Sequence, residues 1–458
     1  MDTLEFQNYA GNHLPDDEVT RGEHGAAELC AGTVVLCSLY YIRLMKERRR
    51  RQVEQRRRVL RFRRTKARER LRFAVLWTSR VLSSRAVSTT TSVTIKESLG
   101  RQSDSNGCPS TLWDSVIEKA FTNFDWLESF RMTKSTFAYL CDQLRPTIEG
   151  IDNDMPSAIP VEVRLAMTLW RLGCSCEYRT IERIFGVSRY TIAKVVGEVC
   201  EAVVSILTPK FITVPRGEIL QNTMKAFEQR FSVPQLAGVI GTFHVAICPP
   251  GELTGQYFNT KGWHSVVLQA VVDSDHCFWD LNIGSPGNSS DSQVLLTSEL
   301  YEWGTEGSLF PNVTRYVGGV EIPVYMLGSR SYPLLPWLMT PFSEQSLPEH
   351  SELNKHFSSA LSTSKEAYDR LKGRWSCLLK RINSDLSFLP IFVATCCTLH
   401  NICESRGDPF QEHWLEEAAE EELEQPSDGE EEEMEPEPMS EEIRDTLANT
   451  VWKQNGGL

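Results

Sequence analysis

Three short apolar segments in the middle of the chain constrain its fold more than any other feature. They are rich in Val, Ile and aromatic residues, are bounded by Gly and Pro, and span 235–247, 265–274 and 277–285. Segments of this kind predict β-strands, and 322–329 predicts a fourth. Helices are expected over 352–382 and 385–405. Several consecutive strands, then a strand flanked by helices, indicate an α/β domain with a mixed sheet over 226–405.

The preceding block, 105–225, is predicted to be all-helical because apolar residues recur every three or four positions, with a break at Pro146. Within it, residues 177–204 have a helix-turn-helix pattern. Gly186 suits a tight turn with positive φ, and Ser188 suits the N-cap of the second helix. The residues expected to face inward from that helix are Ile192, Val195, Val196 and Val199.

Three residues near the start of this second helix, Arg189, Tyr190 and Lys194, are predicted to face outward. This is the part of a helix-turn-helix that meets DNA, so we expect DNA contact here. The alternative is an ordinary helical hairpin that contacts no ligand.

Charge is strongly segregated along the chain. The total of 48 Lys and Arg against 61 Asp and Glu gives a net charge of −13, which taken alone argues against nucleic-acid binding. Residues 46–73, however, carry 15 Lys and Arg against 3 Glu. This run predicts nuclear import or contact with a phosphate backbone, and a charged linker is the alternative. The arginines with the densest spacing are Arg48, Arg49, Arg50, Arg51, Arg56, Arg57 and Arg58.

The two ends of the chain are expected to lack a core. Residues 1–104 form a flexible head whose apolar segment, 29–42, has 14 residues, whereas a membrane-spanning helix needs about 20. A membrane anchor is therefore the less favoured interpretation. Residues 406–458 are predicted to be a disordered acidic tail. Thirteen scattered cysteines favour a reduced intracellular compartment, and no His or Cys spacing indicates zinc.

Several sequence blocks between about 110 and 405 occur in the order typical of one family. In order they are FGVSRYTIAKVVGEVCEAV, QLAGVIGTFHVAICPP, YFNTKGWHSVVLQAVVD, FWDLNIGSPGNSSDSQVLLTSELY, YMLGSRSYPLLPWLMTPF, RLKGRWSCLLKRI and ATCCTLHNICE. The chain thereby resembles the PIF/Harbinger transposase superfamily, including its domesticated nuclease-like members. The resemblance implies an RNase H-like fold in which three acids hold two divalent cations, Mg²⁺ or Mn²⁺. It also implies a separate Myb/SANT-like DNA-binding partner.

The chain departs from the family at each acid position. Gly241 stands in place of the acid on the first strand, Ser329 in place of the acid after the fourth strand, and Lys365, with Glu366 beside it, in place of the helical Glu. A site without carboxylates does not compensate the dehydration of two divalent ions, and an inward-pointing Lys365 would put positive charge where a cation sits.

Three other acids, Asp273, Asp280 and Asp291, are the fallback candidates for a rebuilt metal site. Asp273 is expected to stabilise a turn, and Asp291 to cap the next helix. The favoured hypothesis is a non-catalytic, transposase-derived nuclear protein, present also in the cytoplasm, that binds DNA or chromatin or acts as a scaffold and needs no cofactor. The alternatives are an active metal-dependent nuclease and a membrane-anchored adaptor.

Overall fold

The computed structural model describes residues 122–150, 159–249, 251, 254–342, 347–426 and 437–454, all of which belong to one unit spanning 84–458. The apolar segment 29–42 and the arginine-rich run 46–73 lie outside the described residues. Among the residues described, no helix is both long and apolar enough to cross a membrane.

The first part of the described chain is helical, as expected. Its helices are α5 (Asn123–Phe130), α6 (Lys134–Gly150), α7 (Val161–Cys174), α8 (Tyr178–Phe185), α9 (Arg189–Ile206) and the short α10 (Thr208–Phe211). The predicted break at Pro146 is wrong, because α6 continues to Gly150. Leu144 and Ile148 are both fully buried on either side of the proline, and this packing stabilises the helix against the missing N–H.

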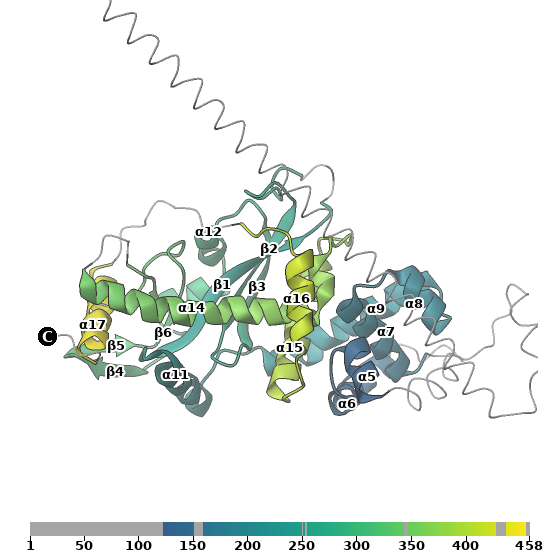
Figure 1. Ribbon diagram of the computed structural model, residues 1–458, viewed down its shortest axis with the longest axis horizontal. Helices are drawn as coiled ribbons and strands as arrows, with labels where there is room; N and C mark the ends of the chain where they lie inside the picture. The colour runs from purple at the N-terminus through teal and green to yellow at the C-terminus, as the bar shows by residue number, and fades with distance from the viewer. Residues whose placement is uncertain are drawn as a thin grey trace, which may run out of the picture. The chain divides into compact units, whose positions relative to one another are not determined.

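A five-stranded mixed sheet follows, which confirms the predicted fold class (Figure 1). Its strands are β1 (Leu236–Ala246), β2 (Ser265–Val272), β3 (Phe278–Pro286), β6 (Tyr325–Leu327) and β7 (Leu338–Met339), in the order β3-β2-β1-β6-β7. The three long strands pair antiparallel, whereas β6 runs parallel to both β1 and β7. Every residue of β2 is buried, as befits a strand covered on both faces.

The fourth predicted strand, 322–329, is divided between two sheets. Its first part belongs to β5 (Val320–Pro323), which pairs with β4 (Thr314–Val317) in a separate ribbon, and its second part is β6. Pro323 ends the ribbon because proline has no N–H to donate to a further ladder bond.

Helices cover both faces of the main sheet. Val239 of β1 packs with Phe227 of α11 (Gly217–Phe231) and Phe357 of α14 (Pro348–Arg374). The next residue, Ile240, packs instead with Leu295 of α12 (Asp291–Leu296) and Leu300 of α13 (Glu299–Thr305). Successive side chains of a strand point to opposite faces, so β1 separates two layers of helices. Helix α14 runs across the sheet in Figure 1, followed by the short η2 (Ser376–Leu379) and by α15 (Leu389–Ser405).

The helical part and the sheet share one hydrophobic core. A single cluster joins Val199 of α9, Phe243 of β1 and Val393 of α15. The boundary expected at residue 225 falls inside α11, which packs against β1. The chain therefore changes secondary structure near that point without beginning a separate core.

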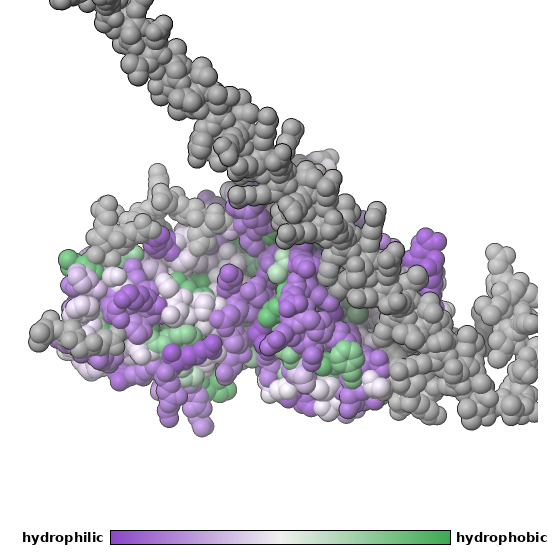
Figure 2. Space-filling model, in the orientation of Figure 1, coloured by the Kyte–Doolittle hydropathy of each residue, from purple (hydrophilic) through white to green (hydrophobic). Residues whose placement is uncertain are grey.

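The expectation of a disordered acidic tail is wrong for 406–426 and 437–454. These residues contain α16 (Glu412–Glu421) and α17 (Pro438–Gln454). Trp414 of α16 is fully buried, and in α17 the buried residues include Ile443, Leu447 and Val451. Despite their acidic composition, α16 and α17 have apolar residues four positions apart, and these form one buried face of each helix. Figure 2 shows mainly hydrophilic side chains on the outer side of α16.

Candidate functional site

Gly241 lies in the middle of β1 and faces α14. A Cβ atom at this position would lie 2.9 Å from Ser364 Oγ and 3.6 Å from the Tyr368 ring. The Tyr368 hydroxyl also donates a 2.8 Å hydrogen bond to the Gly241 carbonyl oxygen. The volume that an acidic side chain on β1 would need is therefore taken by two side chains of α14.

Ser329 lies two residues after the end of β6. The last pairing of β6 with β1 joins Leu327 to Val239, which precedes Gly241 by two residues. Ser329 Oγ is 2.6 Å from Ser331 Oγ, so the hydroxyl is engaged in a local hydrogen bond.

Asp291 reaches β1 next to Gly241, on the face of the sheet opposite to α14. Its Oδ1 accepts a 2.8 Å hydrogen bond from Thr242, the neighbour of Gly241, and its Oδ2 accepts one of 2.8 Å from Ser331. Both carboxylate oxygens are thus bonded to hydroxyl groups. The expectation that Asp291 caps α12 is wrong, because Ser290 is the N-cap and accepts from the Gln293 amide.

The side chain of Gln269, on β2, completes this network. It is 1% exposed, and its Nε2 donates to the Asp291 carbonyl oxygen and to the Tyr332 hydroxyl, each at 3.2 Å. Sequence reasoning identified Asp291 but missed Thr242, Ser331 and Gln269, since nothing in their spacing marks them as its partners.

Lys365, at the third of the family's acid positions, is exposed on α14. Ser364, one residue earlier, faces Gly241 instead. Adjacent residues of a helix differ by about 100° in direction, so a one-residue difference in alignment decides which side chain enters the site.

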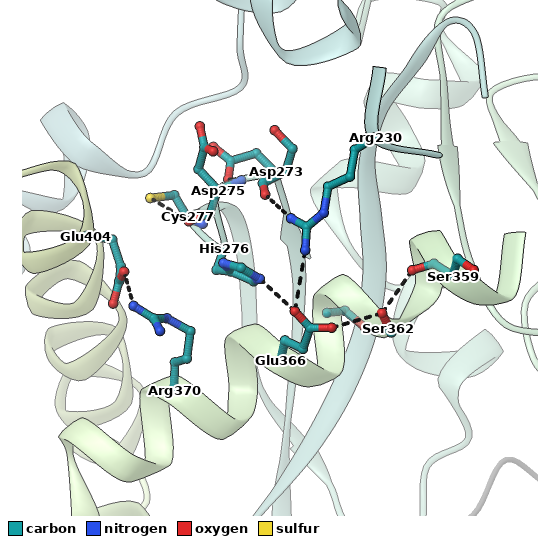
Figure 3. A network of polar contacts seen from close by, with 12 residues as sticks. Arg230, Asp273, Asp275, His276, Cys277, Ser359, Ser362, Glu366, Arg370 and Glu404 are labelled. Atoms are coloured by element: carbon teal, nitrogen blue, oxygen red, sulfur yellow. Dashed lines mark hydrogen bonds and ion pairs between the residues drawn. The ribbon is translucent and has the colours of Figure 1, made fainter. Parts of the chain in front are cut away.

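Glu366, the other candidate on α14, contacts a different set of residues (Figure 3). Its carboxylate is 3.1 Å from His276 Nε2, 3.7 Å from an Arg230 nitrogen and 3.0 Å from the Ser362 hydroxyl. Burial opposes ionisation, yet the hydrogen bonds from His276 and Ser362 and the charge of Arg230 hold the pKa of Glu366 below its ordinary value. Glu366 is therefore an ion-pair partner of the β2–β3 turn.

The remaining fallback acids have separate surroundings. Asp273 accepts backbone hydrogen bonds from Asp275 and Cys277, each 2.9 Å, which confirms its predicted role in a turn. Asp280 lies on β3, where burial and the charge of Glu299 raise its pKa to about 6. Within the described ranges, no three His, Cys, Asp or Glu side chains are grouped so that they could hold a metal ion. Asp273, Asp280 and Asp291 therefore do not converge on a shared site.

The helix-turn-helix pattern is present as predicted. Helix α8 ends at Gly186 with φ of 69°, and the Ser188 side chain accepts from the Thr191 amide at the start of α9. The four residues predicted to face inward are all buried: Ile192, Val195, Val196 and Val199. Tyr190 is 82% exposed, and Arg189 and Lys194 are exposed as well.

Two exposed arginines of α8, Arg179 and Arg183, extend the group of basic residues on α8 and α9. The cations on α9 have acidic neighbours: Arg189 is 3.2 Å from Glu182, and Lys194 is 3.4 Å from Glu198.

Comparison with known proteins agrees with this architecture. The profile of the DDE superfamily endonucleases matches residues 240–401, and a domain of unknown function, DUF8040, matches residues 122–205. The protein named Antagonist of like heterochromatin protein 1, from Arabidopsis thaliana, is 28% identical over 316 residues, which are 67% of this chain and 78% of the relative. The putative nuclease HARBI1 of Homo sapiens is 28% identical over 227 residues, 48% of this chain and 61% of the relative. These matches support the Harbinger transposase-derived nuclease family for this chain. No solved structure matches it.

The residues present do not fit the metal pair of a Harbinger nuclease. Two hard divalent cations need several negatively charged oxygen ligands at fixed positions. Here Gly241 supplies no ligand, and Ser329 and Ser364 supply neutral hydroxyls. Asp291 already accepts a hydrogen bond at each oxygen. A single carboxylate among hydroxyls does not offset the dehydration of two Mg²⁺ ions.

Proposed function

We propose that this Harbinger family member is a non-catalytic nuclear protein that binds DNA. The observation that carries the proposal is the filled site at Gly241, where Ser364 and Tyr368 take the place of an acid and its metal. A chain that keeps the fold but loses the cation ligands retains surfaces for binding while losing the chemistry of strand cleavage.

The exposed face of α8 and α9 supports DNA contact. It carries four cations, from Arg179, Arg183, Arg189 and Lys194, together with the exposed ring of Tyr190. Arginine and lysine bind phosphates, and tyrosine contributes hydrogen bonds to the backbone or contacts with bases. The arginine-rich run 46–73 adds a net charge of +12 by sequence, from 15 Lys and Arg against 3 Glu.

The name of one relative supports an association with chromatin. The Arabidopsis protein is named as an antagonist of a heterochromatin protein-like factor, and we extend a chromatin-associated role to this chain by similarity. A nuclear location, with a further cytoplasmic pool, and a Myb/SANT-like DNA-binding partner are parts of the same proposal.

The proposal is tested with the full chain and a labelled DNA duplex over a series of salt concentrations. The variant is Arg189→Ala/Tyr190→Ala/Lys194→Ala. The control is Arg315→Ala/Tyr316→Ala, which removes a cation and a 73% exposed tyrosine from β4. We expect the α9 variant to weaken binding about tenfold and to lower the salt slope by about 2, since two phosphate contacts are lost.

Unchanged binding by the α9 variant would overturn the assignment of this face. The same preparation is incubated with Mg²⁺ or Mn²⁺, and we expect no strand cleavage. Cleavage that disappears in Asp291→Asn would favour the active nuclease instead.

A further inference from the structure

A short acidic segment at the C-terminal end of α16, residues 421–425, contacts lysines from three separate parts of the chain. One lysine lies between β1 and β2, one in α14 and one directly after η2. We call these three residues the lysine surface. The ion pairs are Glu424–Lys261 at 2.8 Å, Glu422–Lys372 at 2.7 Å and Glu421–Lys380 at 2.6 Å.

The same segment contacts the edge of β1. The pairing of β1 with β6 ends at Val239, so β6 leaves the later part of this edge uncovered. There the His244 amide donates a 2.9 Å hydrogen bond to Gln425 Oε1, and Trp263 Nε1 donates one of 3.1 Å to the Glu424 carbonyl oxygen. Figure 1 shows the segment as the yellow trace that leaves α16. The tail is thus fixed on the sheet by backbone and side-chain contacts as well as by charge.

Lys372 has the most buried side chain of the lysine surface. Its side chain is 5% exposed, and its Nζ lies 2.8 Å from Asp369 and 5.2 Å from the centre of the Phe243 ring. A buried ammonium group needs anionic partners, because desolvation without them is costly. Lys372 forms ion pairs with Asp369 and Glu422, so without Glu422 one of these two anionic partners would be missing.

We propose that the lysine surface is a second nucleic-acid contact, which binds the phosphate backbone, and that residues 421–425 are its intramolecular competitor. Each glutamate takes the position of a phosphate on one lysine, and the chain from Glu422 is extended, with φ of −67° and ψ of 135°. The tail from 412 to 442 carries 16 acidic and no basic residues. It therefore competes with nucleic acid for the same lysines, because both carry a high density of negative charge. The inference rests on the proposed DNA binding, and adds that the tail regulates it.

The test measures DNA affinity of the full chain after the competitor loses its charge. The variant is Glu421→Gln/Glu422→Gln/Glu424→Gln. The matched control is Glu412→Gln/Glu416→Gln/Glu420→Gln, which changes the same net charge at exposed positions of α16. We expect the first variant to bind DNA at least tenfold more tightly with a salt slope up to about 3 steeper, and the control to change affinity less than about twofold.

A second substitution identifies the surface responsible. Lys261→Gln/Lys380→Gln added to the tail variant should remove the gain and return the DNA affinity to that of the unmodified chain. If the unmodified chain binds DNA and the tail variant binds no better, the inference fails and the proposed function stands. If no form binds DNA, both fail. A gain for polyglutamate without a gain for DNA would also overturn the inference, because the surface would then select acidic polypeptides.

Discussion

Trp414 joins the acidic tail to the rest of the protein, and its removal tests whether that tail is part of the fold. The side chain is 0% exposed. Its ring lies 4.4 Å from the Arg131 guanidinium carbon and 5.6 Å from that of Arg374, and its Nε1 donates a 3.1 Å hydrogen bond to Glu128. The variant Trp414→Ala removes all of these contacts at once.

The expected loss follows from these contacts. Replacing a buried Trp by Ala lowers the free energy of unfolding by about 3–5 kcal/mol through lost apolar burial and the cavity left behind. Glu128 keeps a second partner, because His413 Nε2 lies 3.2 Å away, so its carboxylate is not stranded. We therefore expect a loss of about 4 kcal/mol, which for a chain of this size lowers the melting temperature by about 4–6 °C.

Urea unfolding followed by far-UV circular dichroism measures this change without relying on tryptophan fluorescence. The control is Leu415→Ala, the next residue of α16, whose side chain is 36% exposed. That substitution should lower the free energy of unfolding by less than about 0.5 kcal/mol. A loss below about 1 kcal/mol for Trp414→Ala would contradict the docking of α16.

Two further predictions concern the sheet. Gly241→Ala should lower the free energy of unfolding by about 1–2 kcal/mol, because the new Cβ would lie 2.9 Å from Ser364 Oγ. Adding Ser364→Ala should restore most of this loss. Thermal melts of the unmodified chain, both single variants and the double variant measure the coupling, and purely additive effects would contradict the contact. Burial and the charge of Glu299 raise the pKa of Asp280 to about 6, above the unfolded value of about 3.9. The folded state therefore binds the proton of Asp280 more tightly than the unfolded state does. As a result, the free energy of unfolding falls as the pH rises from about 4 to about 6. Asp280→Asn should therefore stabilise the protein by about 3 kcal/mol at pH 8 and hardly at all at pH 3.5. Urea unfolding at both pH values checks this, and equal gains at the two pH values would refute the titration of Asp280 as their source.

The sequence was most informative where a local pattern and a local conformation coincide. The strands at 235–247 and 265–274 are long and apolar on both faces, and the turn at Gly186 with its cap at Ser188 depends on backbone chemistry alone. These features need no information from distant parts of the chain.

Features that depend on tertiary contacts were missed. Average composition made the tail look disordered, although Trp414 and Ala418 form a buried stripe on α16. The alignment gives Lys365 as the counterpart of the family's helical Glu, whereas the α14 side chain that faces Gly241 is Ser364. The partners of Asp291 come from two other segments, at Thr242 and Ser331, and only the folded chain brings them together.

We propose that hydroxyl groups and one hydrogen-bonded carboxylate have replaced the metal centre of the family. Soaking crystals in Mn²⁺ and calculating an anomalous difference map tests it most directly. We expect no manganese peak near Gly241, Ser329 and Asp291. Two strong peaks there, about 4 Å apart, would contradict the account.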